Sequence, residues 1–263
     1  MSAYWALYKI RFIALIQYRS AALTGMVVQL FWGAMLTMIF TAYYKYGNSS
    51  TALALSMEQT ISYIWLAQAM LRIVPWHSDA EIDKLFHDGN IAYELTRPID
   101  LYTGWFFRCL ALRTAPVLLA GIPLWIISWA FMDLHAPPNM DCAIRFAFGL
   151  VGACFVSTAY TTLITVINFW TTSSAGISRL MPYIVGLFSG IVVPLPLLPE
   201  WIQPLFYYQP FRALFDTPVR LYLGQSTSLV EALVHQVCWV LIFIATSRLL
   251  LKRILKHVTV QGG

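Results

Sequence analysis

Six long apolar stretches are the feature that most constrains this chain. A helix needs roughly 20 apolar residues to cross the hydrocarbon core of a bilayer. Stretches of about this length cover residues 21–44, 60–76, 104–131, 143–170, 180–198 and 229–251. Helices are expected because backbone polar groups in lipid must be satisfied within the segment. The pattern therefore predicts an all-α integral membrane protein with six transmembrane helices.

Composition excludes the other broad classes of protein. Apolar residues make up 59% of the 263 residues and charged residues only 11%, against about 25% charged residues in soluble domains. A soluble fold could not cover its surface with so little charge, and a disordered chain would not carry so much apolar bulk. The net charge of +5 is spread thinly along the chain, so we expect no nucleic-acid partner.

The spacing of the apolar stretches predicts one membrane domain over residues 1–263. Residues 1–20 hold aromatic and basic side chains and no acids, which favours an interfacial helix. The remaining parts are spans one and two (21–76), an inner loop (77–103), spans three to five (104–198), an outer segment (199–228), and span six with a tail (229–263). Most of the 17 Lys and Arg residues fall on one side if both termini are cytoplasmic, as the positive-inside rule requires.

Motifs for chemistry are missing from the sequence. No glycine is followed by lysine, so the chain has no nucleotide-binding P-loop. It also lacks the H-E-x-x-H and G-x-S-x-G patterns. We therefore expect a non-catalytic chain with no cofactor or metal of its own.

The inner loop carries a helix signal. Ser78 and Glu81 have the spacing of a capping box, and Gly89 is placed to end the helix. Ile82, Leu85 and Phe86 follow at helical spacing. The pattern predicts a short amphipathic helix over about residues 79–88.

This helix could either rest on the membrane surface or bind a protein partner. Its acidic residues Asp79, Glu81 and Asp83 speak against the membrane surface, because the inner leaflet is itself negative. An acidic helix suits a protein partner better.

The run GNIAYELTRPID at residues 89–100 resembles the inner-loop signature of ABC-2 type ABC transporter permeases, a group that includes a bacterial exporter subfamily formerly of uncharacterised function. Short motifs between residues 188 and 224 resemble the same family in order and spacing. The resemblance implies a transmembrane exporter subunit in the bacterial cytoplasmic (inner) membrane. It also implies a second permease subunit, either a related chain or a second copy, and separate ATPase subunits that bind ATP and magnesium.

On this resemblance the inner loop is the coupling helix that docks on the ATPase. The acids would face basic ATPase residues, the apolar side chains would anchor the helix, and Arg97 and Pro98 would hold the return to the third span. The predicted docking residues are Asp79, Glu81, Ile82, Asp83, Leu85, Phe86, Gly89, Arg97 and Pro98.

The outer segment, residues 199–228, is too polar and too rich in proline to cross a bilayer. The resemblance implies a re-entrant helical hairpin that caps the translocation path, and an ordinary interfacial loop is the alternative. The predicted outer-gate residues are Trp201, Arg212, Asp216 and Arg220, the last three spaced by four so that ion pairs on one helical face are expected.

Polar residues inside the spans are candidates for a substrate path. They are Gln29, Gln68, Ser157, Thr161, Thr165 and Asn168. The alternative is that the hydroxyls bond back to their own helix or hold it to a neighbour. The few ionisable groups in the spans and the resemblance favour a hydrophobic or amphipathic substrate. Two other functions stay open: a membrane-embedded enzyme acting on lipid, and an ATP-independent channel or carrier.

Overall fold

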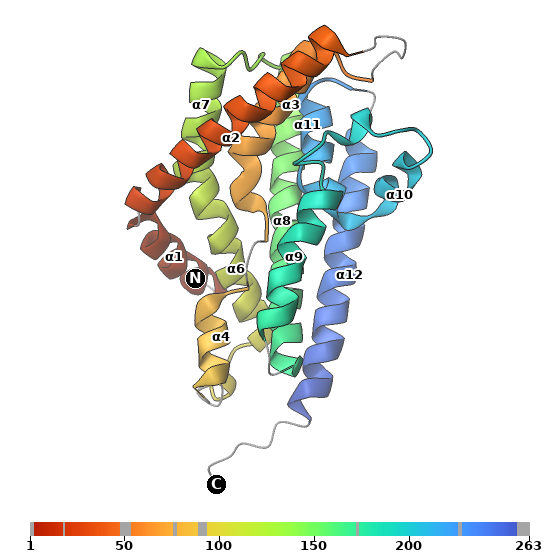
Figure 1. Cartoon of the computed structure of the whole chain (residues 1–263). Coiled ribbons are helices and arrows are strands. Elements are labelled where there is room, and N and C mark those ends of the chain that lie inside the picture. Colours follow the sequence, from red (N-terminus) through yellow and green to blue (C-terminus); the bar gives the residue numbers. More distant parts are fainter. Residues whose placement is uncertain are drawn as a thin grey trace.

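A computed structural model describes residues 3–17, 19–47, 54–75, 78–88, 94–171, 174–225 and 228–256. The regular elements in these ranges are all helical, which confirms the all-α class. Figure 1 shows a bundle in which α4 lies at one end and α10 and α11 lie toward the other. We call these the α4 end and the opposite end.

The α-helices are α1 (Ala3–Gln17), α2 (Arg19–Tyr46), α3 (Met57–Met70), α4 (Ala80–His87), α6 (Leu101–Pro116), α7 (Ile122–Phe131), α8 (Met140–Thr171), α9 (Ser174–Phe188), α10 (Gln203–Tyr208), α11 (Asp216–Tyr222) and α12 (Leu229–Leu255). Three short 3-10 helices are η1 (Leu71–Ile73), η3 (Leu195–Leu197) and η4 (Pro210–Leu214), and η2 (Val117–Gly121) is a π-helical segment between α6 and α7.

Helix α8 forms the centre of the bundle. It packs against α6, α11 and α12, and 72% of its most apolar window is buried, against 11% for α2. A glycine in α8 allows this close packing. A Cβ atom on Gly149 would lie 2.9 Å from the Leu221 side chain and 3.2 Å from the Cα atom of Pro218, both in α11, so the glycine lets α11 pack closely on α8. In contrast, α2 exposes large apolar side chains, among them Val27, Phe31 and Met38, as expected for a helix that faces lipid or another chain.

Four helical stretches of the described residues are long and apolar enough to cross a membrane. They are Ala22–Tyr46, Leu101–Phe131, Met140–Thr171 and Leu229–Leu255. The second and fifth predicted spans correspond to α3 and α9, which have only 14 and 15 residues. A 14-residue helix is about 21 Å long, less than the roughly 30 Å core of a bilayer. The structure thus supports a multi-pass membrane protein, and the six-span topology stays a prediction.

Helix α3 ends early because the chain unwinds through η1 into extended Val74, which leaves backbone carbonyls without helical partners. Two side chains take them up. The Arg113 guanidinium donates to the Val74 carbonyl at 3.0 Å and to the Thr161 hydroxyl at 2.7 Å, and the Ser157 hydroxyl donates to the Ile73 carbonyl. We call Arg113, Ser157 and Thr161 the Arg113 brace. Irregular backbone at membrane depth is tolerated only where protein satisfies it in this way.

Helix α9 also differs from the predicted fifth span. The helix begins at Ser174 and ends at Phe188, although the apolar run continues to residue 198. Gly190 has a φ of +87°, a left-handed conformation that glycine adopts without strain. The prolines that follow prevent the helix from resuming, because proline lacks the backbone donor.

Candidate functional site

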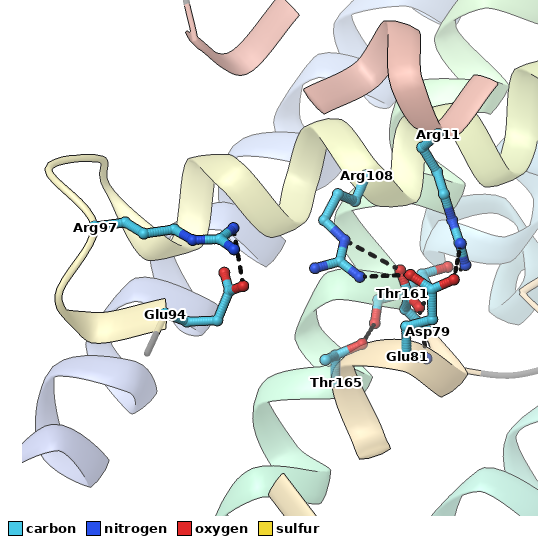
Figure 2. A network of polar contacts seen from close by, with 8 residues as sticks. All are labelled: Arg11, Asp79, Glu81, Glu94, Arg97, Arg108, Thr161 and Thr165. Atoms are coloured by element: carbon cyan, nitrogen blue, oxygen red, sulfur yellow. Dashed lines mark hydrogen bonds and ion pairs between the residues drawn. The ribbon is translucent and has the colours of Figure 1, made fainter. Parts of the chain in front are cut away.

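Two polar clusters lie at the two ends of the bundle, and the first surrounds the start of α4. In Figure 2, Arg11 of α1 and Arg108 of α6 approach Asp79 and Glu81 from opposite sides. The Arg108 guanidinium donates to Glu81 at 3.0 Å and lies 3.8 Å from Asp79. Arg11 pairs with Glu81 and lies 3.6 Å from Asp79. We call these four residues the α4 cluster; it contains two cations and two anions.

The cap of α4 differs from the predicted capping box. The Asp79 carboxylate accepts from the backbone N–H of Glu81 at 2.9 Å, so Asp79 satisfies an orphan donor at the helix start. The Ser78 hydroxyl donates to the Asp83 carboxylate instead, and Glu81 reaches the two arginines rather than its own backbone. The local pattern gave the correct helix with the wrong capping residue, because the arginines come from distant parts of the sequence.

Several predicted docking residues face the interior of the subunit. Asp79 is 1% exposed and Ile82 is fully buried. Ile82 packs in a cluster with Trp105 of α6 and Leu251 of α12. Asp79 and Ile82 thus hold α4 to its own bundle in the described structure, and their predicted contact with a partner stays a prediction.

The other predicted docking residues lie at or near the surface. Leu85 is half-buried, Asp83 is half-buried beside Ser78, and Arg97 and Pro98 are exposed. Arg97 pairs with Glu94 at 3.0 Å, as Figure 2 shows. The side chain of Phe86 and the whole of Gly89 fall outside the described residues.

A hollow of about 660 Å³ separates α1 from α4. Apolar side chains of α1 line one wall and the exposed face of α4 lines the other. Charged residues of both signs line the hollow: Arg11, Glu81, Lys84, Asp88, Glu94, Arg97 and Arg108. Mixed charge and apolar stems suit contact with a protein surface.

The second polar cluster lies at the opposite end, around Asp216. Tyr63 of α3 donates to one carboxylate oxygen at 3.3 Å, and the Arg220 Nε donates to the other at 2.8 Å. The guanidinium of Arg212 lies 4.0 Å from the ring centroid of Tyr207. Burial raises the pKa of the Asp216 carboxyl, and Arg220 and Arg212 partly offset this rise. We call Arg212, Asp216 and Arg220 the Arg212 cluster; its two cations outnumber its one anion.

The predicted ion pairs in this segment form only in part. Arg220 and Asp216 pair across one turn of α11. Arg212 does not share their helix, because it lies in η4 and the chain bends at Phe215, where φ is −130°. A spacing of four residues therefore places only two of the three side chains on one face. Trp201, the fourth predicted gate residue, is 81% exposed on the surface.

The polar residues predicted for a substrate path are buried inside the subunit. Thr161 and Thr165 donate to carbonyls one turn earlier in α8, and Ser157 belongs to the Arg113 brace. The Asn168 amide donates to the Ser78 hydroxyl at 3.1 Å, which ties α8 to the segment before α4. Gln29 and Gln68 are each 4% exposed. These contacts are those of the alternative interpretation, in which polar groups hold helices together, and a lining role stays a prediction.

Several residues of these clusters could not be recognised from their neighbours in the sequence. Arg11 and Arg108 lie in apolar and aromatic stretches of the sequence. An arginine in such a stretch is expected to extend to the lipid headgroups. Tyr63 lies in an apolar run. Their partners are between 27 and 153 positions away, so only the tertiary structure brings them together.

The fold and the two clusters define a multi-pass helical membrane protein with no nucleotide-binding motif in its sequence. Comparison with known protein families identifies the family of this membrane protein. The family model described as "ABC-2 family transporter protein" matches residues 30–262, nearly the whole chain, and the chain belongs to that family. It is thus a permease-type membrane component of a transporter. No curated protein matches the sequence.

Proposed function

We propose that this chain is the permease subunit of an ATP-driven ABC exporter. In this proposal it forms the translocation path for a hydrophobic or amphipathic substrate together with a second permease, a related chain or a second copy. Separate ATPase subunits bind ATP and magnesium and dock at the α4 end. Family membership and the absence of a P-loop support a non-catalytic role. The α4 end and both termini would then face the cytoplasm, and the membrane would be a bacterial inner membrane.

The observation that carries the proposal is the attachment of α4. Ion pairs link it to α1 and α6, and Ile82 packs against α6, α8 and α12. A partner that moves α4 would therefore move several helices together, since a packed core is not continuously deformable. The Arg113 brace would extend that link to the end of α3.

The docking surface is best assigned to the outward parts of α4 and the return segment. Lys84, Leu85 and Arg97 line the hollow beside α1, and Pro98 is exposed. An ATPase surface with apolar and charged side chains would fit this hollow. The two internal residues, Asp79 and Ile82, would act by holding α4 in place for that contact.

Leu85→Asp and Lys84→Glu test the docking surface. The complex of this chain with its ATPase, reconstituted in lipid vesicles, is the material for the test. If these residues dock the ATPase, each variant lowers ATP hydrolysis by the complex about tenfold, equivalent to about 1.4 kcal/mol of lost interaction.

Leu205→Asp is the matched control, because Leu205 is 62% exposed in α10 at the opposite end. It should leave hydrolysis unchanged. The proposal would be contradicted if both α4 variants hydrolysed ATP at the wild-type rate. Full transport by the purified chain without an ATPase would contradict it as well.

A further inference from the structure

The Arg212 cluster borders a small hollow at the opposite end of the bundle. Its volume is about 250 Å³, and Arg212, Asp216 and Arg220 line it together with Tyr207 and Gln203. Small-molecule sites usually measure about 300–1,000 Å³. This hollow is therefore sized for a single polar group rather than for a whole lipid or drug.

Charge in this hollow is unbalanced. Arg220 is paired directly with Asp216 at 2.8 Å. No carboxylate among the described residues lies within ion-pair distance of Arg212, although Asp216 is close enough to act on it electrostatically. One positive charge is left over when Asp216 is ionised. A cation is disfavoured by the two guanidinium groups, and an apolar ligand would leave this charge without a counter-ion.

Arg212 is also short of hydrogen-bond partners. It is 6% exposed, and its buried Nε has no hydrogen-bond partner among the described residues. A buried charged donor without a partner is costly. An acceptor bound in the hollow beside the guanidinium would offset part of this cost.

The Tyr207 ring fixes the direction in which Arg212 can bind. The guanidinium carbon lies 4.0 Å from the ring centroid, so the ring covers one face of the planar group. The N–H donors lie in the plane of the guanidinium, and stacking leaves that edge available. An arginine held in this way presents a fork that matches two oxygens of a phosphate or carboxylate.

We propose that the hollow bordered by Arg212, Arg220 and Tyr207 binds an oxyanion, namely a phosphate group of a lipid headgroup or free phosphate. Arg212 supplies the donor fork, Tyr207 holds it, and Asp216 keeps Arg220 oriented while limiting the positive charge. The link to a lipid headgroup rests on the proposed membrane function. Oxyanion binding itself is measurable on the permease without any ATPase, so its failure is distinct from a failure of ATPase coupling.

Binding is tested on the full chain purified in dodecyl maltoside, at constant ionic strength, by the rise in Tm during titration. The three probes are dihexanoyl phosphatidic acid, inorganic phosphate and dihexanoylglycerol, which lacks the phosphate. We expect a saturable rise with phosphatidic acid and none with dihexanoylglycerol. Tighter binding of the lipid than of phosphate assigns the site to a headgroup. Equal affinity assigns it to free phosphate, and both results support the oxyanion site.

Variants separate this site from general attraction to a basic protein. Arg212→Gln should weaken binding by about tenfold or more, the loss expected for a charge-assisted bidentate contact. Arg145→Gln is the matched control, because Arg145 lies near the start of α8 and its side chain is 39% exposed. It should bind as the wild type does.

Asp216→Asn gives a readout of opposite sign, which a purely structural role would not produce. It removes the competing carboxylate and should tighten binding. The proposal is overturned if neither phosphate probe raises Tm saturably, if Arg212→Gln and Arg145→Gln lose affinity equally, or if Asp216→Asn weakens binding as much as Arg212→Gln does.

Discussion

The α4 cluster and the Arg212 cluster use the same residue types to different ends. At the α4 end, two arginines meet two carboxylates, and the carboxylate of Asp79 also caps a helix. At the opposite end, two arginines share one carboxylate, and a hollow remains beside them. Matched charge fixes one element to another, because each charged side chain of the α4 cluster lies within ion-pair distance of an opposite charge. Unmatched charge beside a hollow leaves a group that another molecule can satisfy.

Breaking the balanced cluster should have the largest effect on stability. Asp79→Asn keeps the shape of the side chain and removes its charge, so Arg11 and Arg108 lose part of their compensation in a largely buried site. We expect the free energy of unfolding to fall by about 3 kcal/mol, the lower range for breaking a buried ion pair. Chemical denaturation in detergent measures this.

Asp141→Asn is the control for that variant. Asp141 also pairs with an arginine, but the pair is exposed, with 60% of the Asp141 side chain accessible. Exposed pairs contribute about 0–1 kcal/mol. Equal losses from the two variants would show that the buried ion pairs of Asp79 contribute no more than an exposed pair.

A smaller difference in stability is expected between variants of two buried arginines, Arg113 and Arg212. Arg113→Met leaves the Val74 carbonyl without its donor and should cost about 1–3 kcal/mol. Arg212→Met removes a buried charge whose Nε has no hydrogen-bond partner among the described residues. It should change stability by less than about 1 kcal/mol when no anion is present, since the cost of that uncompensated charge offsets the stacking lost on Tyr207. Parallel thermal melts of the two variants measure the difference, and the reverse order would contradict the assignment.

The smallest expected effect is a dependence on pH at Asp216. Burial raises the pKa of this carboxyl above its usual value, so the folded chain binds the proton more tightly than the unfolded chain. Stability from this group is therefore greatest at low pH and is lost as pH rises through the folded pKa. Relative to Asp216→Asn, the wild type should gain Tm as pH falls from 7 toward 4. A difference in Tm that stays constant or shrinks over this range would contradict the raised pKa.

The sequence predicted the parts of the fold that depend on local pattern. Long apolar runs gave α2, α8 and α12, and the amphipathic pattern placed a helix at 79–88, where α4 is observed over Ala80–His87. These features need only neighbouring residues, and therefore they can be seen in one sequence.

The features that could not be predicted depend on distant residues. The period of α4 placed Ile82 and Leu85 on one apolar face, yet Ile82 is fully buried in the bundle while Leu85 lines the hollow. The Val74 carbonyl, just after α3 and η1, accepts a hydrogen bond from Arg113 of another helix. The spacing of Arg212 from Asp216 suggested a shared helix face, but the bend at Phe215 separates them.

Site-specific crosslinking in the assembled complex tests the central claim most directly. A benzophenone amino acid at position 84, on the exposed side of α4, would be compared with the same amino acid at position 205 in α10. We expect a crosslink from position 84 to the P-loop ATPase, identified by mass spectrometry, and none from position 205. A crosslink to the ATPase from position 205 alone, in a complex that hydrolyses ATP, would show that the partner docks at the other end of the bundle.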